Sequence, residues 1–327
     1  MGSRDLLIPC LRRMFLTDQL NLTLMIVHAH PDDEVIGSGG TFLHYANEGI
    51  TTVLVCCTSG EEGEIVDPAF DQEEAKPRLG EIRQGELRSA TEVLKISSLE
   101  FLGYRDSGMA GTPANENPEC FHQANVVEAT TRLVRLIRQY RPHVLASYND
   151  FGTYGHPDHI KAYVITHEAF DRAADPSFDP SAELAPWQPL KLYDMAMIRE
   201  QVDIWARNRR EEVERTENGE TAGDPDAKAR ADADKQDELE RGVAFFETIR
   251  DHSMPLAEVT TKIAIGAYWD LKRTALRFHR TQIPADSFFF KPNPDIPTEL
   301  RDFEHFNLVR SLVAVPPRET DLFAGLR

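Results

Sequence analysis

Two short segments rich in histidine and acidic residues stand out in the sequence. The first, "HAHPDDE" at residues 28–34, ends the apolar run "LTLMIV", and the second, "YGHPDH" at residues 154–159, comes soon after the apolar run "VLAS". Imidazoles and carboxylates are ligands for transition metals, and they are also the groups that most often move protons in catalysis. Both segments therefore indicate a metal site or an acid–base site.

Together the two segments offer three ligands to one metal ion. His30 and Asp33 from the first segment and His159 from the second would supply two imidazoles and one carboxylate. Three protein ligands leave a position open for water, as catalytic zinc requires. Since Asp32 cannot readily share a metal face with its neighbour, we expect it to face the water and act as a general base. The predicted cofactor is one Zn²⁺ per chain, although iron or cobalt also suits this donor set.

A His-Pro-Asp segment taken alone has a simpler interpretation, because aspartate and proline are common at the start of a helix. Two such segments, each after an apolar strand, favour the metal site. We expect His28 beside the site, and Glu34 either to support His30 or to cap a helix. The "GSGG" segment at residues 37–40 lacks dinucleotide-binding spacing and follows an acidic loop, so we interpret its glycines as packing a helix closely against the sheet.

Strand-like and helix-like segments alternate around these residues. Strands are predicted within 22–30, 50–60, 99–104, 143–150 and 189–197, and helices within 37–49, 78–96, 125–142 and 156–173. This alternation is typical of an α/β fold with a Rossmann-like, mostly parallel sheet flanked by helices. Ligands of such folds bind beyond the carboxyl ends of the strands, where both histidine-rich segments lie.

We expect the chain to divide into four parts. These are a ragged leader at 1–20, an α/β catalytic core at 21–200, a charged insertion at 201–245 and a smaller C-terminal part at 246–327 that completes the same domain. Residues 207–241 of the insertion are almost free of large apolar side chains and cannot form a core of their own, so we expect solvated helix and loop. In the C-terminal part we predict a strand within 257–268, a helix within 269–283 and a loop-rich tail from 306.

The overall composition excludes several classes of partner. The formal charge of -18 repels phosphate backbones and anionic lipid, so nucleic acid is not expected to bind. No stretch approaches the roughly 18 apolar residues that span a bilayer. The four cysteines form no C-x-x-C pair and are interpreted as reduced thiols in a cytoplasmic protein. The oligomeric state stays open.

Beyond this chemistry, "AHPDDE" together with "GHPDH" resembles the LmbE-like, or GlcNAc-phosphatidylinositol deacetylase-like, family of zinc-dependent amide hydrolases. The segments "TSGEEGEI", "EIRQGEL", "YRDSGM", "LRFHRTQI" and "PPRETDLFAGL" are similar to its mycothiol branch, which contains the deacetylase of mycothiol biosynthesis and the mycothiol S-conjugate amidase. The tail and "GEIVDPAFD" favour the amidase, whereas "DSGMAGT" favours the deacetylase. We rank the amidase slightly ahead.

The resemblance implies roles for residues around the metal. The family's zinc ligands match the three residues named above, and its general base matches Asp32. His156 matches the residue that stabilises the tetrahedral oxyanion, as a cation if it is protonated, with Asp158 orienting it. Tyr154 matches a mobile tyrosine that polarises the substrate carbonyl. His279 lies in an H-x-T-Q segment near the family's site, and we assign it no catalytic role.

The resemblance also implies a polyhydroxylated small-molecule substrate, either a glucosaminide or a thiol conjugate. Arg83, Asp106 and Glu64 match polar contacts to sugar and inositol hydroxyls, and Met109 would line the same pocket. For each of the three charged residues, a surface salt bridge is the simpler alternative.

Two other functions remain open from the sequence. A sugar-binding module with a purely structural metal would need a fourth protein ligand, and none is obvious. A metal-dependent phosphoesterase would need further carboxylates and a basic clamp, for which only Arg83 and Arg105 are candidates. The sequence therefore favours an enzyme, a zinc-dependent hydrolase of an amide on a glucosamine nitrogen.

Overall fold

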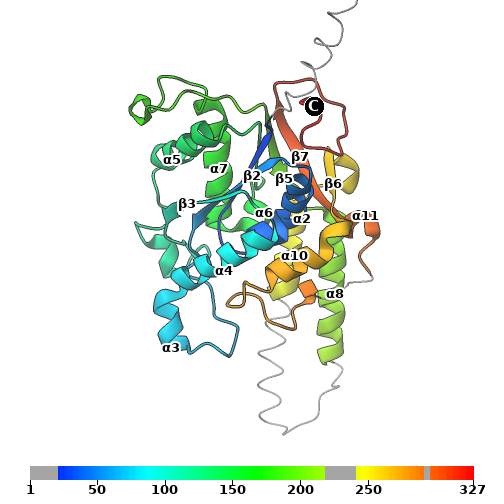
Figure 1. Ribbon diagram of the computed structural model, residues 1–327. Coiled ribbons are helices and arrows are strands. Elements are labelled where there is room, and N and C mark those ends of the chain that lie inside the picture. Colours follow the sequence, from blue (N-terminus) through cyan, green and yellow to red (C-terminus); the bar gives the residue numbers. More distant parts are fainter. Residues whose placement is uncertain (1–20, 218–240, 291–294) are drawn as a thin grey trace, which may run out of the picture.

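The computed structural model describes residues 21–217, 241–290 and 295–327 (Figure 1). The predicted leader at 1–20 and residues 218–240 of the predicted insertion lie outside the described residues. Within the described part, one seven-stranded sheet has the strand order β3-β2-β1-β4-β5-β7-β6. The strands are β1 Thr23–His28, β2 Thr51–Thr58, β3 Ser98–Tyr104, β4 Val144–Ser147, β5 Lys191–Met195, β6 Thr261–Ala264 and β7 Phe303–Ser311.

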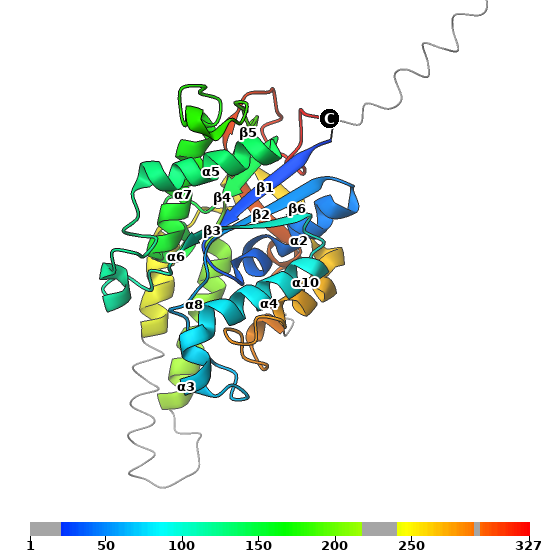
Figure 2. The same cartoon turned by 60° about the vertical axis from the view of Figure 1, so that its left-hand side comes forward.

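Helices cover both faces of this sheet. The α-helices of the described residues are α2 Asp33–Asn47, α3 Gln72–Ala75, α4 Leu79–Val93, α5 Val126–Tyr140, α6 Gly152–Gly155, α7 Pro157–Arg172, α8 Arg199–Glu217, α10 Trp269–Leu276 and α11 Thr298–Arg301, and residues 241–251 are also helical. Figure 2 shows α5 and α7 on one side of the sheet and α2, α4 and α10 on the other. Accordingly, α5 packs against α7, and α10 packs against α2 and α4.

The central strands are buried along their whole length because both of their faces are covered. Every residue of β1 and of β4 is buried, and the two strands pair in parallel with Leu24 opposite Val144. The strands β1 to β5 are parallel to one another. The predicted α/β class with a mostly parallel sheet is therefore confirmed.

One sequence prediction was wrong, because the tail is not loop-rich at its start. Phe303–Ser311 forms β7, which lies between β5 and β6 and is antiparallel to both. Toward its end the strand has exposed and half-buried side chains in a row rather than alternating buried and exposed ones. The sequence from 306 therefore lacks the alternating apolar pattern that would have indicated a strand. The strand is stabilised by pairing with β5, which is distant in sequence, with Lys191 opposite Ser311. The residues after the insertion therefore add β6 and β7 to the same sheet.

None of the helices in the described ranges has the length and apolar character needed to cross a membrane.

Candidate active site

The candidate site lies between the loops that follow β1 and β4. The first loop runs from the end of β1 to the start of α2 at Asp33, and the second leads through α6 to α7, which begins at Pro157. Because β1 and β4 are adjacent and parallel, their carboxyl ends lie side by side at one edge of the sheet. The two histidine-rich segments face each other there.

Three ligand-type atoms converge between these loops. Nδ1 of His30 lies 3.2 Å from Nε2 of His159 and 3.4 Å from Oδ2 of Asp33. Nε2 of His159 lies 3.3 Å from the same carboxylate oxygen. Three ligands bound at zinc's usual 2.0–2.1 Å in tetrahedral geometry lie about 3.3 Å apart. Both the donor types and their spacing therefore fit a metal ion such as Zn²⁺.

The second ring nitrogen of His30 supports this arrangement. Nε2 lies 3.2 Å from Oδ2 of Asp158 and 3.5 Å from Oδ1 of Asp106. Metal-binding imidazoles commonly donate their other N–H to a carboxylate, which fixes the tautomer. Burial lowers the pKa of His30, but Asp106 and the other neighbouring carboxylates outweigh it and raise the pKa well above its ordinary value. In the neutral ring these carboxylates keep the proton on Nε2, so once the cationic form has lost its second proton the lone pair of Nδ1 faces the convergence point.

His30, Asp106 and Asp158 form an alternative group of ligand atoms, as do His30, His156 and His159. We favour the convergence on Nδ1, because its two imidazoles and one carboxylate lie within 3.2 to 3.4 Å of one another, as the ligands of one tetrahedral ion would. The carboxylates of the Nε2 side are held by hydrogen bonds from the protein. Asp106 accepts from the backbone amides of Glu62 and Gly108, and the amide of Ser107 donates to Asp158 over 2.9 Å.

The contacts of Asp158 differ from the role expected for it. Its carboxylate meets the amide and hydroxyl of Ser107 and Nε2 of His30, rather than orienting His156. Only its backbone amide reaches His156, donating to Nδ1 over 3.2 Å at the start of α7. Ser107 was not among the residues predicted for the site, although it lies in the "YRDSGM" segment directly after Asp106.

His156 is held as a neutral hydrogen-bond donor. Because Nδ1 accepts the amide of Asp158, the proton of the neutral ring resides on Nε2. Burial, together with the nearby His30 and His159, lowers the pKa of His156 to about 2. The ring centroids of His30 and His159 lie 4.5 and 5.2 Å away. A cationic His156 is therefore disfavoured, since three close imidazoles compete for protons.

Asp32 is held in an unusual backbone conformation, with φ 108° and ψ -29°. Positive φ is uncommon for a residue other than glycine. Nη2 of Arg83 donates to the carbonyl of Pro31 over 2.6 Å and to Oδ2 of Asp32 over 3.2 Å. Burial raises the pKa of Asp32 to about 6, against the opposing charge of Arg83. A carboxylate with a pKa close to neutrality is well suited to act as a general base.

The four residues expected at the substrate fall into two pairs. Arg83 is 3% and Asp106 is 4% exposed, and both belong to the buried cluster. Since Nη1 of Arg83 donates to the carbonyl of Gly60 and Nη2 holds the Asp32 loop, much of the guanidinium serves the protein itself. Glu64 is exposed, and Met109 is 44% exposed. The structure does not bring this second pair into the cluster.

Tyr154 lies beside the convergence point on the short helix α6. Its hydroxyl is 3.5 Å from Nε2 of His159. The backbone around it is irregular, with φ 68° at Thr153 and positive φ at Gly152 and Gly155. Burial raises the pKa of Tyr154, so the phenol stays protonated and able to donate.

A second tyrosine, Tyr148, was not anticipated from the sequence. Its hydroxyl donates to Oδ2 of Asp33 over 2.8 Å and accepts the amide of Ala29 over 2.7 Å. Its ring stacks on His159 with centroids 4.0 Å apart. The available signal was its place directly after β4, where side chains point into the site. Tyr148 therefore positions two of the three converging side chains.

Glu34 and His279 form a further buried contact that the sequence did not predict. Nε2 of His279 is 2.8 Å from Oε1 of Glu34, and both side chains are fully buried. Burial lowers the pKa of His279, but the charge and hydrogen bond of Glu34 outweigh this effect and raise it overall. His28 lies beside the site as expected, with Nδ1 3.2 Å from the hydroxyl of Tyr148, and its Nε2 is 2.8 Å from the hydroxyl of Ser38.

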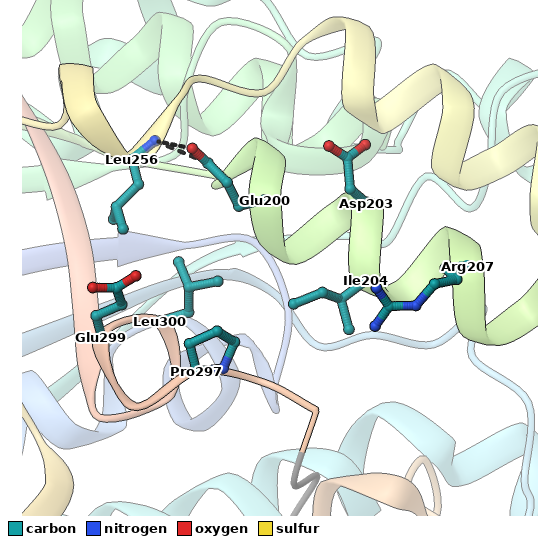
Figure 3. A pocket seen from close by; sticks show the side chains of 8 residues that line it. All are labelled: Glu200, Asp203, Ile204, Arg207, Leu256, Pro297, Glu299 and Leu300. Atoms are coloured by element: carbon teal, nitrogen blue, oxygen red, sulfur yellow. Dashed lines mark hydrogen bonds between the residues drawn. The ribbon is translucent and has the colours of Figure 1, made fainter.

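A surface pocket of about 380 Å³ lies elsewhere, between α8 and the segment around α11 (Figure 3). Its lining residues are Glu200, Asp203, Ile204, Arg207, Leu256, Pro297, Glu299 and Leu300. The carboxylate of Glu200 accepts the backbone amide of Leu256 over 2.9 Å, as Figure 3 shows. None of these residues belongs to the cluster between β1 and β4, so the pocket is separate from the candidate site.

Known proteins resemble this chain over most of its length. Residues 25–170 match the PIG-L family, GlcNAc-PI de-N-acetylase. The 1D-myo-inositol 2-acetamido-2-deoxy-alpha-D-glucopyranoside deacetylase 1 of Frankia alni is 39% identical over 92% of this chain and 99% of its own length. The corresponding deacetylase of Nocardiopsis dassonvillei is 40% identical over 92% of this chain and 100% of its own length.

Among solved structures, N,N'-diacetylchitobiose deacetylase from Pyrococcus horikoshii has a TM-score of 0.56 at 18% identity, covering 94% of this chain and 95% of its own. At that identity the likeness shows the fold alone. Fold, site and sequence relatives together define an α/β enzyme that hydrolyses a carbon–nitrogen amide bond. The chain belongs to the GlcNAc-PI de-N-acetylase family, also called PIG-L or LmbE-like.

Proposed function

We propose that the protein is a zinc-dependent deacetylase that removes the acetyl group from the glucosamine nitrogen of an N-acetylglucosaminyl-inositol or a closely related small glycoside. The observation that carries the proposal is the convergence of His30 Nδ1, Asp33 Oδ2 and His159 Nε2, whose mutual distances are 3.2 to 3.4 Å. The names of the sequence relatives support the class of substrate.

A zinc ion held by these three residues would supply Lewis acidity, which polarises a carbonyl and makes water a better nucleophile. Asp32 then takes a proton from the attacking water and later returns it to the amine, because an amine is a poor leaving group until it is protonated. Its carboxylate is kept in place by Arg83 at 3.2 Å.

Two donors are placed to receive the negative charge that develops on the carbonyl oxygen. The Nε2–H of His156 can donate to the substrate, because the hydrogen bond with the backbone of α7 uses Nδ1. The hydroxyl of Tyr154 is 3.5 Å from Nε2 of His159, and the ring centroids of Tyr154 and His156 are 6.0 Å apart. A single donor of this kind is worth about 3 kcal/mol in the transition state. Neither donor needs to carry a positive charge.

The relatives favour removal of an acetyl group over cleavage of a thiol conjugate. Motifs alone ranked the conjugate amidase slightly ahead, with deacetylation as the alternative. Relatives at 39% and 40% identity over nearly their whole length bear the name of the deacetylase. The proposal therefore takes the deacetylase as the main activity and keeps the amidase as a competing outcome of the test.

The test measures amine release from N-acetylglucosaminyl-inositol, from other N-acetylglucosaminides and from a bimane-labelled mycothiol conjugate. We expect the first substrate to be cleaved most efficiently. We expect Asp32→Ala to keep one metal ion per chain and to lose roughly 10²- to 10⁴-fold in turnover, the usual contribution of a general base.

The exposed residue Asp171 provides a matched control, because its carboxylate pairs only with Arg310 at the surface among the contacts described. Asp171→Ala should keep both metal and turnover. Faster release from the thiol conjugate would replace the deacetylase with the amidase. Loss of metal in Asp32→Ala would make that aspartate a ligand and would contradict its role as the base.

A further inference from the structure

The loop that carries the general base needs support that its own sequence does not provide. Asp32 adopts φ 108°, whereas L side chains favour negative φ. It stands between Pro31 and the first residue of α2, Asp33. A carboxylate on such a backbone keeps its direction only if neighbouring groups fix the peptide on either side.

Glu34 fixes one of these peptides. Its Oε2 accepts the backbone amide of Asp32 over 2.9 Å, while its Oε1 is 2.8 Å from Nε2 of His279. Since an ionised carboxylate can only accept, His279 must donate this hydrogen bond. The two oxygens of one carboxylate thus connect the base loop to a residue 245 positions away.

The segment that holds His279 is itself anchored. The amide of Ile283 donates to the carbonyl of His279 over 2.9 Å. Two residues after His279, Thr281 donates its amide and its hydroxyl to the carboxylate of Glu86 in α4, over 2.9 and 2.7 Å. Thr281 and His279 are both fully buried. Glu34 therefore meets a fixed donor rather than a mobile surface side chain.

On the basis of the proposed function, we propose that Glu34 and His279 are a positioning pair, which holds the backbone of Asp32 so that its carboxylate faces the reacting water. Glu34 contributes none of the three converging ligand atoms. The contacts described for its carboxylate are to Asp32 and His279. The pair therefore acts on the reaction through Asp32, without touching metal or substrate.

A second buried ion pair in the same layer supplies a matched control. Lys272 of α10 donates to Glu304 over 2.6 Å, and Glu304 accepts the amides of Gly40 and Thr41 in α2. Lys272 also donates to the carbonyl of Ile36 in α2 over 3.0 Å. This buried pair therefore joins α10 and β7 to α2 through Ile36, Gly40 and Thr41, and none of the hydrogen bonds described for it reaches Asp32 or Glu34. A purely structural role for His279 would make both pairs behave alike.

The test compares His279→Ala, His279→Gln and Lys272→Met. We expect His279→Ala to lower kcat by about 10- to 100-fold, the range for residues that orient a metal site from outside. KM and the metal content should stay unchanged. His279→Gln, which restores a donor toward Glu34, should recover much of kcat. Lys272→Met should lower Tm but leave the kcat of the folded protein unchanged.

A second readout is independent of the reaction. Hydrogen exchange at the Asp32 amide, followed by NMR in the metal-free protein, should be faster in His279→Ala than in wild type and unchanged in Lys272→Met. An unchanged kcat and unchanged exchange in His279→Ala would overturn the positioning pair, even if the wild type proves to be a deacetylase. If the wild type cleaves no glucosaminide, the proposed function fails. The exchange rate of the Asp32 amide then still shows whether Glu34 and His279 hold the backbone of Asp32.

Discussion

Two buried clusters of charged residues in this molecule are built on opposite principles. In the cluster around Glu319, Lys191 donates to one carboxylate oxygen over 2.5 Å. The hydroxyls of Tyr193 and Thr261 donate to the other oxygen over 2.8 and 3.0 Å. The acid meets a cation and two further donors, so the cluster is closed. It ties β5, β6 and the C-terminal tail together.

The cluster between β1 and β4 is open instead. Three acceptor-type atoms point at one another across 3.2 to 3.4 Å, and among the described residues no lysine or arginine lies between them. The carboxylates gathered there are Asp32, Asp33, Glu34, Asp106 and Asp158, and the buried Arg83 donates to one of them, Asp32. A closed cluster stabilises the fold, whereas an open one is arranged for a cation. Three substitutions test this contrast.

The largest effect is expected at the open cluster. His159→Gln removes one of the three converging atoms, so metal should be lost and activity should fall by more than the roughly 100-fold typical of residues outside the ligand set. Metal analysis and the amine-release assay measure both. The free energy of unfolding of the metal-free protein should change less than it does in the lysine variant described next. A variant that kept both metal and turnover would remove His159 from the ligand set.

The closed cluster should respond in stability instead. Lys191→Met leaves the carboxylate of Glu319 buried without its cation, which typically costs about 3–5 kcal/mol. Urea unfolding measures the loss, and the folded variant should keep its metal and its kcat. The double variant with Glu319→Gln should regain part of the stability, because no buried charge is then left unpaired. If the single variant lost its metal while staying fully stable, the contrast between the clusters would be wrong.

A smaller effect is expected at Tyr148, which supports the open cluster from outside. Tyr148→Phe removes the hydrogen bond to Asp33 but keeps the ring against His159, so metal affinity should fall about 10- to 100-fold. Competition with a chelator of known affinity measures this change. Tyr140→Phe is the matched control, since its hydroxyl donates to Glu100 and not to a site residue. Equal affinities in the two variants would show that the hydroxyl of Tyr148 does not support the ligands.

The parts of the site that could be predicted from the sequence are those whose residues lie close together along the chain. The apolar run of β1 and the residues His30, Asp32 and Asp33 occupy one short segment, and the order of strands places it beside the loop that carries His159. The fold class followed from the same alternation of strands and helices. Local pattern and general chemistry were sufficient there.

The supporting contacts could not be predicted in this way, because each joins residues that are distant in sequence. Tyr148 and Asp33 are separated by 115 positions, and His279 and Glu34 by 245. Nothing in the spacing around Ser107 indicates that its hydroxyl meets Asp158. The strand β7 was missed for the same reason, since its partners are set by the tertiary fold. The neutral state of His156 depends on the imidazoles packed around it, which the sequence does not place.

The most direct test of the central claim is a crystal structure of the protein grown with zinc, with anomalous diffraction recorded on both sides of the zinc absorption edge. We expect one zinc peak per chain, in contact with Nδ1 of His30, Oδ2 of Asp33 and Nε2 of His159. A peak on the opposite side of the ring, held by Nε2 of His30 with Asp106 and Asp158, would contradict it, as would the absence of any zinc between the two loops.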